Sequence, residues 1–304
     1  MLLVPLINML RQTHWDAQIT LVTRPAFGEL LKYLGQIEEF ASAENLVNTR
    51  WFAEEAPDCA PPWAHCDLLL SAVSNGKDAW ANNARRSPAR QVCFFDPRPP
   101  TDYPRHVTSF HRQQLVAQGI PLPPPPTSEP RPLGSDREDA NSLRSLPYGR
   151  GSTHHRAADG AGGVVIHPGS GGRAKCWDWK NFVQLGEKLA DCGYRCQFVL
   201  GEVERERWPH EVIRRIRDGF PTLMEPTLME LAKHIRSAKL YIGNDSGVTH
   251  VAGLLGVETL ALFGASNAVQ WSPVGRAVRV LQANTLEDLL VEEVWRVARE
   301  MLAT

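Results

Sequence analysis

Features that mark membrane-spanning, secreted and nucleic-acid-binding proteins are scarce in this sequence. A membrane-spanning helix requires about 18 consecutive apolar residues, and no apolar run in this sequence is that long. The formal net charge is only −1, which argues against a protein that binds nucleic acid in general. Residues 1–10 are apolar but lack the basic segment and the small-residue cleavage site of a signal peptide. We therefore expect a cytoplasmic protein.

Motifs for zinc sites and for redox-active cysteine pairs are also missing. None of the 6 cysteines falls in a C-x-x-C pair, and no histidine cluster completes a zinc site. We find no convincing D-x-D metal motif. From these patterns we expect no metal, no cofactor and reduced thiols at Cys59, Cys66, Cys93, Cys176, Cys192 and Cys196.

Hydrophobic patterning predicts an α/β fold, and 304 residues suffice for one large or two medium domains. Residues 1–120 form the predicted N-terminal domain, in which Gly35 and Gly119 end two helices. The predicted helices of this domain cover 2–11, 27–34 and 106–118, and its predicted strands cover 19–22, 67–70 and 92–95. The domain begins on a helix with no strand before it.

Residues 121–163 interrupt this alternation. Pro123 to Pro126 is a proline run, which favours extended polyproline II structure. The segment 132–135 is echoed by 147–152, and apolar residues are too sparse to build a core. We therefore expect a disordered or loosely held linker.

Residues 164–304 alternate more regularly and predict a parallel, doubly wound sheet. The predicted strands cover 164–167, 196–200, 240–242, 259–263 and 278–281. The predicted helices cover 178–191, 204–217, 227–237 and 247–255, followed by a terminal helix that residues 285–288 cap. The apolar stripe of that terminal helix includes Leu286, Leu289, Leu290, Val294 and Val297.

Two of the predicted strands end in loops suited to a phosphate ligand. The strand at 164–167 runs into the glycine-rich segment 168–172 and then Lys175, and the strand at 240–242 runs into the turn 243–247. At the carboxyl ends of parallel strands, such loops and helix N-termini present free N–H groups to phosphates. Plain strand-to-helix turns are the alternative explanation of the same residues.

Together these stretches resemble glycosyltransferase family 9, the ADP-heptose:lipopolysaccharide heptosyltransferase family. The family's P-G-S/T, K-x-W, D-[ST]-G-x-x-H and F/Y-G motifs are matched in order by residues 168–170, 175–177, 245–250 and 263–264. The match extends from Val164 to about Pro273, and a looser match covers 3–120.

This resemblance implies a GT-B fold, in which two Rossmann-like domains face each other across a cleft. The N-terminal domain would bind the acceptor, and the C-terminal domain, residues 164–304, the donor. The implied activity is inverting, metal-independent transfer of a sugar from a nucleotide diphosphate, such as ADP-heptose, to a lipopolysaccharide-type glycan. The acceptor also implies peripheral contact with the inner face of the cytoplasmic membrane, and no nucleic-acid partner is expected.

The matched loops supply most of the candidate donor-binding residues. Lys175 is the candidate cation for the diphosphate, with a solvated surface lysine as the alternative. Ser170, together with the amides of Ser246 and Gly247, is expected near the same group. The resemblance places Asp245 in the donor site, and its position also suits a helix cap.

Two further candidates have simple structural alternatives. His250 ends the D-S-G-x-x-H motif, but it could also be a helix histidine with satisfied hydrogen bonds. Glu204 follows a strand where family members often carry an acid for the nucleotide ribose, and a first-turn acid on a helix is the alternative. Asn267 is a weaker candidate, whereas Trp177 and Trp179 are expected to pack rather than stack on a base.

The catalytic base is not identified in this sequence. In the family, a strand and a G-D loop precede the first helix, and the aspartate of that loop is the proposed general base, so it would lie upstream of Met1. Asp67, Asp78 and Asp96 are carboxylates in the acceptor half without a motif. We expect this chain to bind donor but to transfer poorly. A non-catalytic nucleotide-sugar binder and a nucleotide-sugar epimerase of the same fold remain open alternatives.

Overall fold

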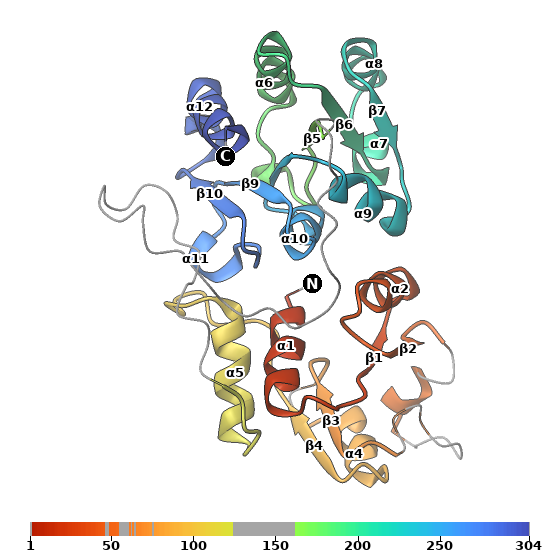
Figure 1. The fold of residues 1–304 in the computed structure, drawn as a ribbon. Helices are drawn as coiled ribbons and strands as arrows, with labels where there is room; N and C mark the ends of the chain where they lie inside the picture. The colour runs from red at the N-terminus through yellow and green to blue at the C-terminus, as the bar shows by residue number, and fades with distance from the viewer. Residues whose placement is uncertain are drawn as a thin grey trace. The chain divides into compact units, whose positions relative to one another are not determined.

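The computed structural model describes residues 2–45, 49–54, 61, 63, 65–74, 76–123 and 162–303 (Figure 1). The chain divides into two compact units. Of the described residues, 2–123 belong to the N-terminal unit and 162–303 to the C-terminal unit. The predicted linker at 121–163 falls almost entirely outside the described residues.

The N-terminal unit combines short parallel strand pairs with helices. β1 (Thr20–Thr23) pairs with β2 (Glu39–Ser42), and β3 (Leu68–Ser71) pairs with β4 (Gln91–Phe94). Its helices are α1 (Val4–Thr13), α2 (Pro25–Tyr33), α4 (Ala79–Arg86) and α5 (Val107–Ala117), with the 3-10 helix η1 (Arg50–Phe52). One core cluster joins α1, α5 and β4 through side chains that include Leu6, Met9, Cys93 and Leu115.

β2, α4 and the short η1 were not predicted from the sequence, whereas the predicted helices and strands are present with small shifts at their ends. β2 lacks a strong alternating pattern, and half of the α4 sequence AWANNARR is polar. α4 nevertheless buries Trp80 and Asn83. Nδ2 of Asn83 donates to the carbonyls of Trp51 and Ala53 at 3.0 and 2.9 Å. These bonds tie α4 to the segment around Trp51, a contact that the local sequence does not reveal.

A six-stranded parallel sheet organises the C-terminal unit in the order β10-β9-β8-β5-β6-β7. The strands are β5 (Val164–His167), β6 (Cys196–Leu200), β7 (Thr222–Met224), β8 (Leu240–Asn244), β9 (Glu258–Phe263) and β10 (Val278–Gln282). Counted within this unit, the order is that of a doubly wound dinucleotide-binding sheet, as predicted. The strand order reverses between β5 and β8, which pair in register from Val164–Leu240 to His167–Gly243.

Helices cover both faces of this sheet (Figure 1). Alternate residues of the central strand β5 point to opposite faces, and all of them are buried. One layer packs with Val164 and Ile166 and comprises α6 (Trp179–Asp191), α8 (His210–Gly219) and α12 (Val291–Leu302). The other layer packs with Val165 and Tyr241 and comprises α9 (Leu228–Arg236) and α10 (Gly247–Leu254).

The single helix predicted over 204–217 is wrong. The structure has α7 (Glu202–Arg207) and then α8, with Trp208 and Pro209 between them. Pro209 has no N–H to continue a helix, and it becomes the N-cap residue of α8 instead. β7 and α11 (Ala268–Trp271) were not predicted, because elements this short show no clear period.

The terminal helix begins later than predicted. Thr285 and Asp288 form the expected capping box, but it caps the start of the 3-10 helix η3 (Leu286–Asp288). The α-helix α12 begins only at Val291. Most of the predicted apolar stripe is buried, whereas Leu290 is 66% exposed because it occupies the bend before α12.

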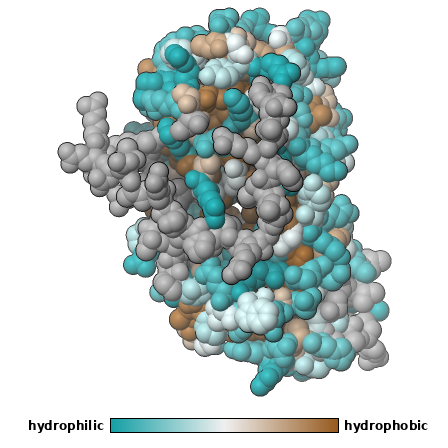
Figure 2. Space-filling model, in the orientation of Figure 1, coloured by the Kyte–Doolittle hydropathy of each residue, from teal (hydrophilic) through white to brown (hydrophobic). Residues whose placement is uncertain are grey.

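No helix within the described ranges is both long and apolar enough to cross a membrane. On the face drawn in Figure 2, hydrophilic side chains cover much of the described surface, and hydrophobic ones form smaller groups. The exposed large apolar side chains come from separate elements of both units and include Trp15, Tyr33, Phe52, Val73 and Leu290.

Candidate functional site

The candidate donor site lies at the carboxyl ends of β5 and β8. β5 leads into residues 168–172 and the 3-10 helix η2 (Arg173–Lys175), and β8 leads through Asp245 and Ser246 into α10. The two strands are neighbours at the point where the strand order reverses. In open parallel sheets, ligands bind in the crevice between the loops at this point. The fold therefore brings together the two loops that the sequence singled out.

Lys175 and Asp245 form an ion pair between these loops. Nζ of Lys175 donates to Oδ2 of Asp245 at 2.6 Å. The side chain of Asp245 is 8% exposed and that of Lys175 is 46% exposed, so the lysine remains accessible to a ligand. Oγ of Ser170 donates to the backbone carbonyl of Asp245 at 2.7 Å. The structure thus unites three of the predicted donor-binding residues.

Asn244 joins the same loops and was missed by the sequence analysis. Its Nδ2 donates to the carbonyl of Pro168 at 2.8 Å, and its Oδ1 accepts from the amide N–H of Trp177 at 3.0 Å. Asn244 is fully buried. The signal was available, because an amide directly after a buried strand has to find partners in the interior. Its sequence neighbours, Gly243 and Asp245, indicated only a turn.

Ser246, rather than Asp245, caps α10. The Ser246 hydroxyl accepts from the amide N–H of Thr249 at 3.4 Å. The expectation that Asp245 caps this helix is therefore wrong, because its carboxylate pairs with Lys175 instead. Gly247 is the first helical residue and is exposed. The N–H groups of the first turn and the helix dipole favour an anion at this end.

Buried hydroxyl groups hold the turn that precedes α10. Oγ1 of Thr249 donates to the carbonyl of Asn244 at 2.5 Å and lies 3.2 Å from Oη of Tyr241. Burial raises the pKa of Tyr241, so its hydroxyl stays protonated and can donate. Gly243 provides the space, since a Cβ there would lie 2.5 Å from Oη of Tyr241. These buried contacts of Thr249 and Tyr241 thus fix the direction of the first amide N–H groups of α10.

Glu204 is a buried carboxylate beneath the glycine-rich loop. It is 2% exposed, and its Oε2 accepts from the amide N–H of Gly201, the N-cap residue of α7, at 2.7 Å. Burial raises its pKa. A Cβ at Gly169 would overlap the Glu204 carboxylate, so the loop approaches this closely only with glycine there. The structure shows the first-turn role, and contact with a ribose remains a prediction.

His167 ends β5 beside Glu204 and was not singled out from the sequence. Its Nε2 lies 3.9 Å from Oε2 of Glu204. Burial lowers the pKa of His167 to about 4, so the ring is neutral near neutral pH and this contact is not an ion pair. Nδ1 has no hydrogen-bond partner among the described residues. A histidine that ends a buried strand before P-G-S was the available signal.

The remaining candidates lie around this centre. His250 is a half-buried residue of α10, and Oδ1 of Asn267 accepts from the amide N–H of Val269 at 3.0 Å as the cap of α11. Trp177 is 1% exposed, and its Nε1 donates to the carbonyl of Leu289 at 2.9 Å. Trp179 packs against the same core. The prediction that both tryptophans serve packing is confirmed.

The three carboxylates considered in the N-terminal unit differ in environment. Asp78 caps α4 and also accepts from Oγ of Ser74 at 2.7 Å, and the Ser74 bond lowers its pKa most. Oδ1 of Asp96 accepts from the amide N–H of Arg98 at 2.8 Å. Asp67 is exposed. None of these contacts marks a general base. In the described part of the chain, no group of three or more His, Cys, Asp or Glu side chains could hold a metal ion.

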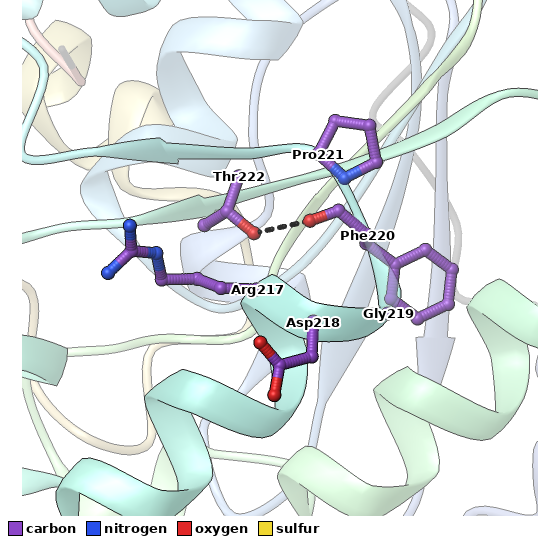
Figure 3. A pocket seen from close by; sticks show the side chains of 6 residues that line it. All are labelled: Arg217, Asp218, Gly219, Phe220, Pro221 and Thr222. Atoms are coloured by element: carbon purple, nitrogen blue, oxygen red, sulfur yellow. Dashed lines mark hydrogen bonds between the residues drawn. The ribbon is translucent and has the colours of Figure 1, made fainter.

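A shallow pocket lies away from these loops (Figure 3). It has a volume of about 370 Å³ and is lined by residues 217–222. Oγ1 of Thr222 donates to the carbonyl of Phe220 at 2.9 Å at its edge. Thr222 begins β7, so the pocket lies at the amino-terminal end of that strand, opposite the carboxyl ends that carry the candidate site. We assign it no part in donor binding.

Comparison with known sequences identifies one family. The family model for glycosyltransferase family 9 (heptosyltransferase) matches residues 131–292. Lipopolysaccharide heptosyltransferase 3 of Escherichia coli is 27% identical over 186 residues, which cover 57% of this chain and 54% of that protein. Lipopolysaccharide heptosyltransferase 1 of Pseudomonas aeruginosa is 26% identical over 228 residues, covering 69% and 58%. The chain thus spans little more than half of the length of these curated relatives.

Comparison with solved structures supports the same fold over nearly the whole chain. The glycosyl transferase family 9 structure from Veillonella parvula has a TM-score of 0.71 at 18% identity and covers 99% of this chain and 93% of that one. The E. coli heptosyltransferase WaaC with ADP has a TM-score of 0.67 at 17% identity, covering 99% and 95%. This likeness confirms the predicted GT-B fold class.

Proposed function

The chain belongs to glycosyltransferase family 9, and on that premise we propose that it transfers a sugar from a nucleotide diphosphate to a glycan. The donor is an ADP-heptose-like nucleotide sugar, and the acceptor is a glycan of the lipopolysaccharide type. The family model and the names of the relatives support this choice of donor and acceptor.

The single observation that carries the proposal is the Lys175–Asp245 pair at the switch point of the sheet. Negative charge grows on the diphosphate as the glycosidic bond breaks, and a fixed cation with oriented N–H groups stabilises it. Lys175 supplies the cation, and the first turn of α10 at Ser246 and Gly247 supplies the N–H groups. Ser170 and His250 complete the proposed donor site from the same loop and helix.

We further propose an inverting transfer that needs no metal ion. The acceptor hydroxyl oxygen attacks the anomeric carbon while the bond from that carbon to the diphosphate oxygen breaks. A general base takes the hydroxyl proton, and the nucleotide diphosphate leaves with the bonding electrons. We assign the base to none of the residues that the structure describes. The proposed acceptor places the reaction at the cytoplasmic face of a membrane, with peripheral contact.

The test is a transfer assay with the full chain, ADP-heptose and a lipopolysaccharide acceptor that lacks heptose, with products followed by mass spectrometry. We expect an acceptor product that is heavier by one heptose, released ADP and no loss of rate in a chelator. Nucleotide release or an epimerised sugar without acceptor would indicate the epimerase alternative instead. Donor binding by calorimetry with no turnover would indicate a non-catalytic binder. No binding of ADP-heptose would refute the proposal.

A further inference from the structure

The charges beneath the glycine-rich loop leave the donor site short of positive charge. The carboxylate of Asp245 already faces Lys175 at 2.6 Å. A second carboxylate, that of Glu204, packs directly beneath Gly169. A nucleotide diphosphate brings several more negative charges to the same loop. A site that holds it without a metal ion therefore needs another cation within reach.

Arg207 supplies a cation at this loop. It is the last residue of α7, and its Nη1 donates to the carbonyl of Gly171 at 3.2 Å. That bond uses one of five guanidinium N–H groups. The ion pairs found among the described residues do not include Arg207. Most of its hydrogen-bonding capacity therefore remains for a ligand.

The charge of Arg207 acts on the groups that support the loop. Burial raises the pKa of both Glu204 and Cys176, and the positive charge of Arg207 opposes that rise at each of them. The guanidinium thus lies close enough to influence the buried carboxylate below Gly169 and the thiol after Lys175. Its bond to the Gly171 carbonyl keeps it at the rim of the loop.

We propose that Arg207 is the second cation of the donor site and binds the diphosphate through the N–H groups that Gly171 leaves free. This inference rests on the proposed function, because it concerns the same nucleotide diphosphate. A planar guanidinium can bind two phosphate oxygens at once, which a lysine cannot do. Lys175 and Arg207 would then bind the diphosphate together, Arg207 from its position at Gly171 and Lys175 from the short helix that follows the loop.

Arg205 provides a matched control on the same helix. Its Nε pairs with Oε1 of Glu225 at 2.6 Å, next to β7. Both arginines are exposed, and both lie in the last turn of α7. Replacing either by glutamine removes the same charge from the protein, but only Arg207 contacts the loop.

The test measures binding of ADP, inorganic pyrophosphate and adenosine by calorimetry to the full chain and three variants. We expect Arg207→Gln to weaken ADP and pyrophosphate about ten-fold, or about 1.4 kcal/mol, and to leave adenosine unchanged. Arg205→Gln should leave all three affinities unchanged. Arg207→Lys should retain part of the pyrophosphate affinity. The fall of pyrophosphate affinity with salt should be less steep in Arg207→Gln than in the wild type, because one charge contact is gone.

The outcomes separate this inference from the proposed function. Wild-type protein that fails to bind ADP refutes both. If the wild type binds ADP and Arg207→Gln binds it with the same affinity, the role of Arg207 is overturned and the proposed function is not. Equal losses in the lysine and glutamine variants, with an unchanged salt dependence, would mean that Arg207 only supports the loop and would also overturn it. Thermal unfolding of each variant checks that the exposed substitutions leave the fold intact.

Discussion

Lys175 and Asp245 are 70 residues apart in the chain, yet Nζ of one lies 2.6 Å from Oδ2 of the other. Each residue comes from a loop that follows one of the two central strands, β5 and β8. The Asp245 carboxylate holds the lysine at the point where the diphosphate is proposed to bind. The pair therefore contains one group that attracts the ligand and one that repels it.

Removing either member of this pair should change ADP affinity in opposite directions. Lys175→Gln should weaken ADP binding about ten-fold or more, because a charge-assisted contact to phosphate is lost. Asp245→Asn should tighten it, because the repulsion between carboxylate and diphosphate disappears, and it should fold normally since Ser246 is the cap. Calorimetry with ADP, and with adenosine as the uncharged control, measures both effects. Identical ADP affinities in all three proteins would exclude the pair from the site.

Asn244 should contribute far more to stability than an exposed cap does. Asn244→Ala leaves the Trp177 N–H and the Pro168 carbonyl without their buried partner, which should cost about 3 kcal/mol. Asn267→Ala is the control, because it removes an exposed cap and should cost about 1 kcal/mol. Urea unfolding gives both free energies. A cost for Asn244→Ala no larger than the control would show that the loops adjust without this bridge.

Gly169 should tolerate no side chain, whereas Gly171 should accept one. A Cβ at Gly169 would overlap the Glu204 carboxylate, and relieving that contact should cost about 1–3 kcal/mol. No atom lies within 4 Å of a Cβ built at Gly171, so Gly171→Ala should change stability by less than about 0.5 kcal/mol. Thermal and urea unfolding of the two alanine variants test this contrast. A Gly169→Ala protein as stable as the wild type would show that Glu204 can move away freely.

His167 should make the fold less stable in weak acid. Its pKa is about 4 in the folded protein against 6.5 for the free group, so the unfolded chain binds more protons between these values. The neutral His167 ring therefore adds about 3 kcal/mol to the free energy of unfolding above about pH 6.5. This stabilisation is lost as the pH falls toward about 4. Glu204 acts in the opposite sense, because its raised pKa favours the folded state at low pH and the benefit fades as the pH rises.

The measurement is urea unfolding over a pH series. His167→Asn should flatten the loss of stability in this window, and Glu204→Gln should steepen it by removing the opposing group. If His167→Asn leaves the pH dependence unchanged, another group titrates there.

The sequence was a reliable guide wherever local patterns and tertiary contacts agree. The five longest strands of the C-terminal unit were predicted because buried parallel strands are continuous apolar runs, and Gly193 and Gly256 mark helix ends with φ of 86° and 72°. Pro209 splits a helix that the apolar pattern joins, because one residue without an N–H outweighs that pattern. α4 was missed for the reverse reason, since its hydrogen bonds to the Trp51 and Ala53 carbonyls cannot be inferred locally.

Within the candidate site, the motifs located the loops but not the bonds between them. Lys175, Asp245 and Ser170 were all predicted, and their meeting follows from strand order, which only the assembled sheet defines. Ser246 rather than Asp245 caps α10 because Lys175 lies next to the Asp245 carboxylate and pairs with it. The strand ends carried a signal for His167 and Asn244, but their partners come from other segments and are defined only in the folded unit.

The strand order also determines when the paired loops can first exist. β5, β6 and β7 precede β8 in the chain, so β8 can pair with the other side of β5 only after residue 244 has been synthesised. Contacts between segments this distant in sequence close a long loop and form slowly. The ion pair between Lys175 and Asp245 can therefore form only after β8 has paired with β5. The proposed nucleotide binding would then require that the two halves of the sheet have joined, and a ligand would stabilise the contact between them by mass action.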